Sequence, residues 1–205
     1  MPHSLHRALA TERSAYTGET PSAAAPGTTR DGQLGLDHCS RPQRRLRALL
    51  AIAVLNCGPD AAWLAETSLH ELSVYTFALS PRYDDLIVIS NAAENIGNRL
   101  LPSHGKREGL CLPGMRLVEY TGESMHLLHL PSGARMTTTR NRNGLSQRSP
   151  VNGDWWWHTD KPLTDRERNA LAALPSLTPD AEVLLASLLV RFCLQDPEGG
   201  WDIGM

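Results

Sequence analysis

Three six-residue runs in the middle of the chain constrain the fold more than any other feature. The runs are Met115–Tyr120, Met125–Leu130 and Ala134–Thr139. They are joined by the polar connectors Thr121–Ser124 and Pro131–Gly133, which are typical of hairpin loops. Each run has the length and composition of a strand. We therefore expect an antiparallel meander at the centre of the fold.

Two further segments extend the predicted sheet. Ser73–Leu79 and Leu86–Ile89 are rich in β-branched, aromatic and other apolar residues, and the turn-forming stretch Ser80–Asp85 separates them. Residues 91–101 suit a short helix that Gly97 weakens. The sequence thus predicts an α+β protein whose antiparallel sheet has about five strands.

Helical patterns lie on both sides of these strands. Apolar residues recur at helical spacing from Arg41, and a second N-terminal helix is expected to begin at Pro59. Thr164 and Glu167 form a capping box that opens a helix extending to about Leu174. A last helix begins near Thr178 and is apolar on almost all sides. We expect these last two helices to form a C-terminal helical hairpin.

Residues 1–40 are predicted to be a disordered tail, and residues 41–205 a single α+β domain. The stretch from Thr17 to Gly32 is rich in Gly, Pro, Ser and Thr and has no apolar periodicity. Such a composition buries too little apolar surface to offset the entropy lost on ordering. A length of 205 residues suits one domain and a tail.

Composition excludes several classes of protein. No apolar run approaches the roughly 18 residues that span a bilayer, so we expect no membrane association. The formal net charge is −2, whereas a general nucleic-acid coat protein would be strongly basic. The four cysteines form no C-x-x-C pair. We therefore expect a cytoplasmic protein with no metal site and no cofactor.

Cysteine chemistry is the third candidate function. Cys111 follows Lys106 and Arg107, and nearby cations lower the pKa of a thiol. His104 is the candidate base. The alternative is that Cys111 is a small buried apolar residue.

Charge is distributed in two opposite blocks. Residues 99–148 hold eight basic and three acidic residues, whereas residues 149–205 hold four basic and nine acidic residues. We call residues 135–148 the basic arm; its candidate binding residues are Arg135, Arg140 and Arg142. The arm is suited to phosphate contacts, or it faces the acidic C-terminal helices of its own or a partner chain.

Trp155, Trp156 and Trp157 complete the candidate binding residues, because three consecutive indoles cannot all point inward from one regular element. The alternative is that they form a hydrophobic lid over the meander. The leading function is a non-enzymatic binding, adaptor or regulatory protein that recognises another protein. The alternative is a nucleic-acid-binding regulator that uses the basic arm. We also expect a homodimer through the last helix, whose apolar surface exceeds what one core contact needs.

Overall fold

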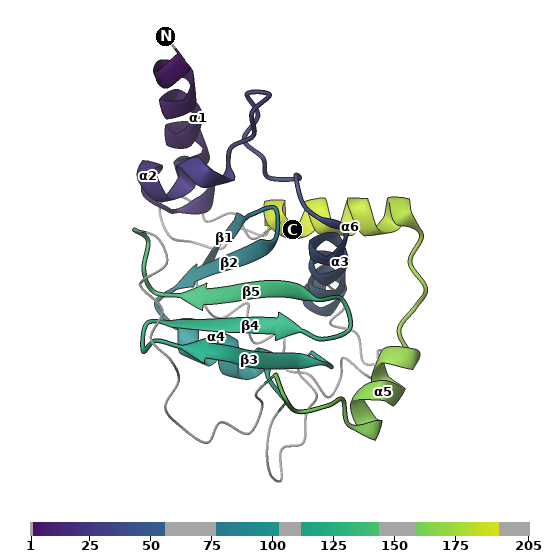
Figure 1. Ribbon diagram of the computed structural model, residues 1–205. Coiled ribbons are helices and arrows are strands. Elements are labelled where there is room, and N and C mark those ends of the chain that lie inside the picture. The colour runs from purple at the N-terminus through teal and green to yellow at the C-terminus, as the bar shows by residue number, and fades with distance from the viewer. Residues whose placement is uncertain (1, 56–76, 103–111, 144–158, 193–205) are drawn as a thin grey trace.

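The computed structural model describes residues 2–55, 77–102, 112–143 and 159–192, and it shows a mixed α+β fold (Figure 1). Five strands form one sheet: β1 (Phe77–Pro81), β2 (Asp85–Ser90), β3 (Met115–Tyr120), β4 (Ser124–His129) and β5 (Ala134–Thr139). The order across the sheet is β1-β2-β5-β4-β3. The α+β class and the number of strands are therefore confirmed.

The sheet is mixed, so the prediction of a wholly antiparallel sheet is wrong. β5 pairs with β4 and β4 pairs with β3 in antiparallel fashion, but β2 and β5 run parallel from Asp85↔Arg135 to Ile89↔Thr139. β5 is the last of these five strands along the chain and lies between β2 and β4. Apolar periodicity fixes which side of a strand is buried, but it does not say which distant strand pairs with it.

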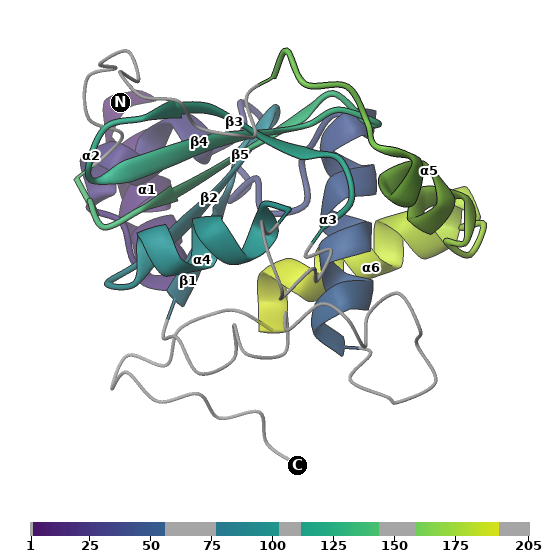
Figure 2. The same ribbon diagram turned by 90° about the horizontal axis from the view of Figure 1, so that it is seen from below.

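Helices cover one face of the sheet. α3 (Arg41–Leu55) and α4 (Ala93–Leu100) both lie on the same side of it (Figure 2). Alternate residues of the strands point toward them, including Leu86, Val88 and Leu127, and form the hydrophobic core. A Cβ atom added to Gly97 would collide with Met125 Sδ and Thr138 Oγ1. This glycine therefore lets α4 approach the sheet closely.

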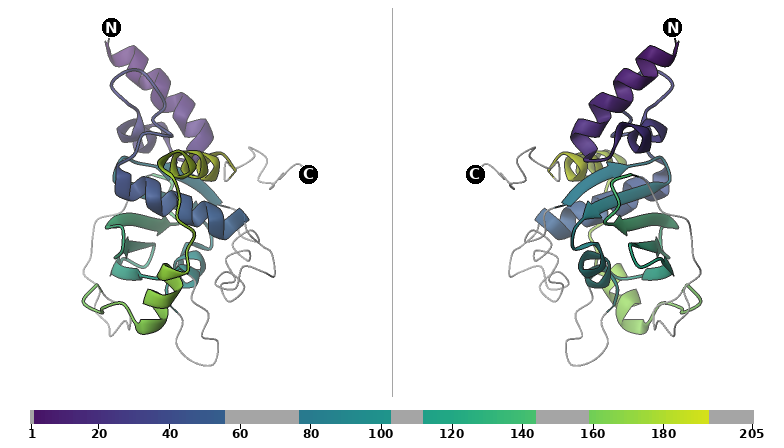
Figure 3. Two further views of the ribbon diagram at one scale, coloured as in Figure 1. Left: turned by 90° about the vertical axis from the view of Figure 1, so that its right-hand side faces the viewer. Right: turned by 90° about the vertical axis from the view of Figure 1, so that its left-hand side faces the viewer.

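The two C-terminal helices are not packed together as the predicted hairpin. α5 (Asp165–Ala172) lies beside β3, whereas α6 (Pro179–Phe192) crosses α3 near the β1 edge of the sheet (Figures 1 and 3). Each helix has its own anchor: Glu167 of α5 pairs with Arg116 of β3, and Leu189 of α6 is buried in the core. The helix expected from Pro59 lies outside the described residues.

The N-terminal segment is folded, which corrects the prediction of a disordered tail. α1 (Pro2–Thr17), α2 (Pro21–Ala24) and the short 3-10 helix η1 (Ala25–Gly27) pack beside β1 (Figure 1). The buried Arg13 guanidinium donates to the carbonyls of Leu34 and Pro81. Glu19 accepts from Ser80 Oγ at 2.5 Å and pairs with Arg82. Polar contacts hold this segment, and a pattern of apolar residues does not reveal them.

His129 gives the fold a dependence on pH. The side chain is buried at the end of β4, where Nδ1 lies 2.8 Å from Ser132 Oγ and Nε2 lies 3.2 Å from the carbonyl of Pro113. Burial lowers the pKa of this imidazole from 6.5 to about 4. As the pH falls below 6.5, His129 therefore becomes protonated in the unfolded chain while it stays neutral in the folded protein.

We expect the free energy of unfolding to fall between pH 6.5 and pH 4, with the His129 contribution amounting to about 2 kcal/mol at pH 5. Urea unfolding at pH 7 and pH 5 measures this change. His129→Leu is the control, because other groups titrate equally in both proteins. An identical pH dependence in the two proteins would contradict the assignment.

Candidate functional site

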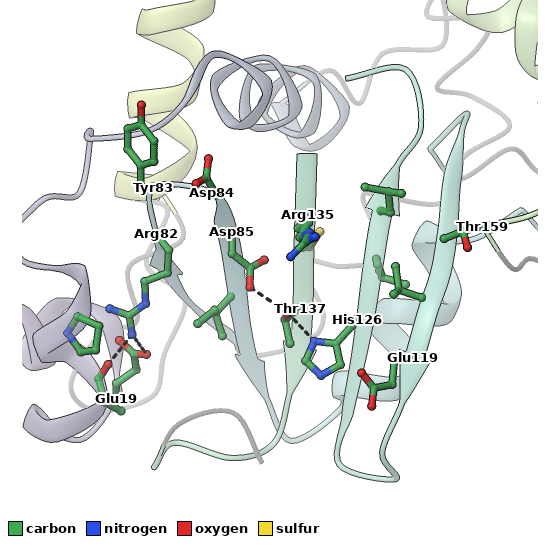
Figure 4. A pocket seen from close by; sticks show the side chains of 17 residues that line it. Glu19, Arg82, Tyr83, Asp84, Asp85, Glu119, His126, Arg135, Thr137 and Thr159 are labelled. Carbon is green, nitrogen blue, oxygen red and sulfur yellow. Dashed lines mark hydrogen bonds and ion pairs between the residues drawn. The ribbon is translucent and has the colours of Figure 1, made fainter. Parts of the chain in front are cut away.

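A groove of about 800 Å³ lies on the face of the sheet opposite α3 and α4 (Figure 4). One wall comes from the N-terminal segment and the β1–β2 turn, and the other comes from β3. We call it the sheet-face groove and define it by the lining residues Glu19, Ala23, Pro26, Arg82, Tyr83, Asp84, Asp85, Ile87, Val118, Glu119, His126, Leu127, Leu128, Arg135, Met136, Thr137 and Thr159.

Strand alternation and register bring the floor residues together. Asp85 and Arg135 are direct partners across β2 and β5, and His126 is the partner of Thr137 across β4 and β5. Residues that pair directly point to the same side of a sheet, and so do residues two positions apart on a strand. Asp85, Thr137 and His126 therefore meet over the middle of the sheet, although they are distant in the sequence.

A chain of hydrogen bonds joins these three residues (Figure 4). Thr137 Oγ1 donates to Asp85 Oδ2 at 3.1 Å, and His126 Nδ1 lies 3.1 Å from Thr137 Oγ1. Because the hydroxyl proton is directed at Asp85, the geometry assigns a proton to Nδ1 of His126. Thr137 is buried, so its hydroxyl links the two titratable groups from below the groove surface.

Burial is the largest influence on Asp85 and raises the pKa of its carboxyl group. Hydrogen bonds from Thr137 and from the Leu86 amide act in the opposite direction, as do the nearby His126 and Arg135. The carboxyl group is thus held in a site where the charged form is less favoured than in water. A cation that enters the groove beside it would favour the charged form.

The groove lining carries more negative than positive charge. Arg82 is 2.5 Å from Glu19, so these two charges compensate each other in the wall. The other carboxyl groups of the lining are Asp84, Asp85 and Glu119, and its other basic side chains are Arg135 and His126.

Apolar side chains are exposed on both sides of this charged floor. Tyr83 is 52% exposed, and its ring contacts that of His38 at a tilt of 38°, with the centroids 4.8 Å apart. Val118 on β3 is 47% exposed. Both residues line the groove. The site therefore offers apolar contact area together with charge, as protein-recognition surfaces do.

The structure separates the arginines of the basic arm. Arg135 lies in the sheet-face groove, whereas Arg140 and Arg142 are exposed beyond the end of β5. The carbonyl of Arg142 accepts from the Thr20 amide at 3.0 Å, which ties this end of the arm to the N-terminal segment. Five residues of extended strand, about 17 Å, separate Arg135 from Arg140.

Several predicted site residues lie outside the described part of the chain. They are Cys111, His104, Trp155, Trp156, Trp157 and the end of the basic arm after residue 143. Within the described ranges, no group of three or more His, Cys, Asp or Glu residues could hold a metal ion. In those same ranges, no helix has the length and apolar character needed to cross a membrane.

The fold and this groove define a mixed α+β protein with a charged, partly apolar surface on one face of its sheet. No protein-family model, curated protein or solved structure matches the chain.

Proposed function

We propose that this protein recognises another protein through the sheet-face groove. The observation that carries the proposal is the pairing of exposed apolar side chains, Tyr83 and Val118, with a charged floor between them. Exposed apolar groups supply contact area, and the charges supply orientation and selectivity. The groove forms on the strands of the sheet, so its floor is rigid.

Nucleic-acid binding is the second candidate, and it depends on the exposed Arg140 and Arg142. Phosphate contacts need several cations within reach of one backbone. Arg135 lies instead among the carboxyl groups of the groove, so it adds little to a phosphate surface with the other two arginines. The charge balance therefore favours a protein partner. The hypothesis that Cys111 is a catalytic nucleophile stays a prediction.

Two matched valines allow a direct test of the groove. Val118 is 47% exposed in the groove, and Val183 is 46% exposed on α6, away from it. We expect Val118→Arg to abolish the capture of partner proteins from the native host, because the larger side chain occupies the groove. Val183→Arg should leave the capture of host proteins other than the chain itself unchanged, since α6 is expected to contact a second copy of the chain. Quantitative mass spectrometry of nuclease-treated eluates measures the difference.

A partner set that is lost only with Val118→Arg supports recognition through the groove. Capture that is equal in all three proteins, or lost with both variants, contradicts it. Retention of nucleic acid that disappears when Arg140 and Arg142 are replaced by Ala would favour the second candidate. Such retention must also weaken steeply with salt, because binding releases counterions.

We also propose self-association through the exposed side of α6. Leu189 and Val190 are buried, whereas Val183 is 46% and Leu184 is 60% exposed. Leu184→Glu should shift a homodimer toward monomer at micromolar concentrations, since a charge would have to be buried. Sedimentation velocity of the two proteins measures this shift. A wild-type protein that sediments as a monomer at high micromolar concentration would contradict the dimer.

A further inference from the structure

We infer that the N-terminal segment, residues 2–40, is a movable wall of the sheet-face groove, so that its docking on β1 and the recognition of the partner are coupled. Arg13, which does not line the groove, is the positioning residue that holds this wall. The inference rests on the proposed function, since it specifies how the same site is controlled.

The N-terminal segment builds one side of the groove. Glu19, Ala23 and Pro26 line it, and they come just before α2, from α2 and from η1. Arg82 joins this wall to the sheet, because its guanidinium pairs with Glu19 and donates to the carbonyls of Ala23 and Ala24 (Figure 4). The groove therefore has its shape only while the segment is docked.

Arg13 holds the segment from outside the groove. Its guanidinium is buried in α1 and donates to the carbonyls of Leu34 and Pro81. Leu34 belongs to the segment and Pro81 to β1, so one side chain ties the segment together and attaches it to the sheet. Arg13 Nη2 also lies 3.4 Å from Ser80 Oγ, which donates to Glu19 of the wall at 2.5 Å. A path of hydrogen bonds thus connects Arg13 to the groove.

The attachment is of a kind that opens locally. Among the described residues, the hydrophobic core cluster begins at Leu46 and includes no residue of the segment. Arg13 Nε is buried and has no hydrogen-bond partner in the described part of the chain. A Cβ atom added to Gly27 would collide with both Arg13 and Arg82, so these two cations lie side by side. Few apolar contacts and a like-charge contact both lower the free energy needed to release the segment.

Release of the segment gives the groove a second state that lacks one wall. The partner contacts the wall only in the docked state, so its binding favours docking. Linkage makes this effect reciprocal, since a change that undocks the segment must also weaken the partner. A substitution of Arg13 should therefore reduce recognition although its side chain lies outside the groove.

Capture by full-length variants tests one direction of the coupling. The groove partner is the protein that the wild type captures from the native host and Val118→Arg does not. Arg13→Met should capture it roughly tenfold more weakly, as expected when about one molecule in ten has a docked segment. Arg7→Met is the matched control, because Arg7 is exposed on the same helix. Gly27→Ala should act like Arg13→Met, because the added methyl group displaces Arg13 and Arg82.

Amide hydrogen exchange of the wild-type full chain tests the other direction and requires no variant of Arg13. The groove lining begins at Glu19, so α1 lies outside it. A single helix of 16 residues is marginal in water, so exchange of the α1 amides reports release of the segment. The purified groove partner, at saturating concentration, should slow this exchange at least roughly tenfold. It should not slow exchange in Val118→Arg.

Two results would overturn the coupling and leave recognition through the groove intact. One is full capture of the groove partner by both Arg13→Met and Gly27→Ala. The other is exchange of the α1 amides that the partner does not change in the wild type. Capture of host proteins that Val118→Arg does not alter would overturn both the coupling and the proposed function.

Discussion

Replacing Glu167 by Gln should lower the free energy of unfolding by about 3–5 kcal/mol, because it removes the carboxylate that pairs with the buried guanidinium of Arg116. Arg116 and Glu167 are both fully buried. Arg116 Nη1 donates to Glu167 Oε1 at 2.7 Å, and Arg116 Nη2 donates to Oε2 at 2.9 Å. The Gly114 amide also donates to Oε1 at 2.9 Å. Glu167 therefore fastens α5 to the start of β3.

The protonation state of Glu167 agrees with this role. Burial raises the pKa of the carboxyl group, but the hydrogen bonds from Arg116, Thr164 and Gly114 outweigh burial and hold the pKa below its usual value. The charged form therefore persists at neutral pH. Its contribution to stability is present above the unfolded-state pKa and is lost as the pH falls through the folded-state pKa.

Urea unfolding at pH 7 measures the Glu167→Gln effect. Asp165→Asn is the matched control, since Asp165 lies in the same helical turn but is exposed and should change stability by less than about 1 kcal/mol. If Glu167→Gln does not fold, Arg116→Met combined with Glu167→Leu should restore a folded protein, because it removes both buried charges. Equal stability of Glu167→Gln and the control would contradict the arrangement.

Arg13→Met should release the N-terminal helices from the sheet, because it lowers the free energy needed for their local opening by roughly 3 kcal/mol. The substitution leaves the buried carbonyls of Leu34 and Pro81 without their donor. It also removes the contact with Ser80 Oγ at 3.4 Å. Burial and the neighbouring Arg82 lower the pKa of Arg13 to about 10, so the guanidinium is still charged at neutral pH.

Proteolysis measures this release. In the wild-type protein, we expect thermolysin to cut residues 2–40 slowly, whereas in Arg13→Met the same segment should be cut first. Arg7→Met is the control, because Arg7 is exposed on the same helix. Rapid cleavage of the wild-type segment would show that it is not held as described, and equal rates in Arg13→Met and Arg7→Met would assign no role to the buried guanidinium.

Local sequence patterns predicted the elements that depend on local physics. The runs expected at 115–120 and 134–139 correspond to β3 and β5, and the capping box at Thr164 is present. Hairpin connectors and caps act over a few residues, so the sequence displays them directly. The sequence does not show that Glu167 also pairs with Arg116, because Arg116 lies 51 residues away along the chain.

Local sequence patterns do not predict which distant strands pair with each other. The parallel contact of β2 with β5 brings together residues about 50 positions apart, and no local signal specifies it. The same contact builds the floor of the groove. Arg135 could be named as a binding residue from its charge, but Asp85 and Thr137 become site residues only once β2 and β5 are neighbours. The N-terminal contacts of Arg13 were missed for the same reason.

The most direct test of the central claim is amide chemical-shift mapping on the ¹⁵N-labelled full chain. The probe is the protein that the wild type captures from the native host and Val118→Arg does not. We predict that titration shifts the amides of Asp84, Asp85, Arg135, Thr137 and His126, and that Val118→Arg removes these shifts. Shifts confined to α6 or to the exposed end of the basic arm at Arg140 and Arg142, or an unchanged spectrum, would contradict recognition through the sheet-face groove.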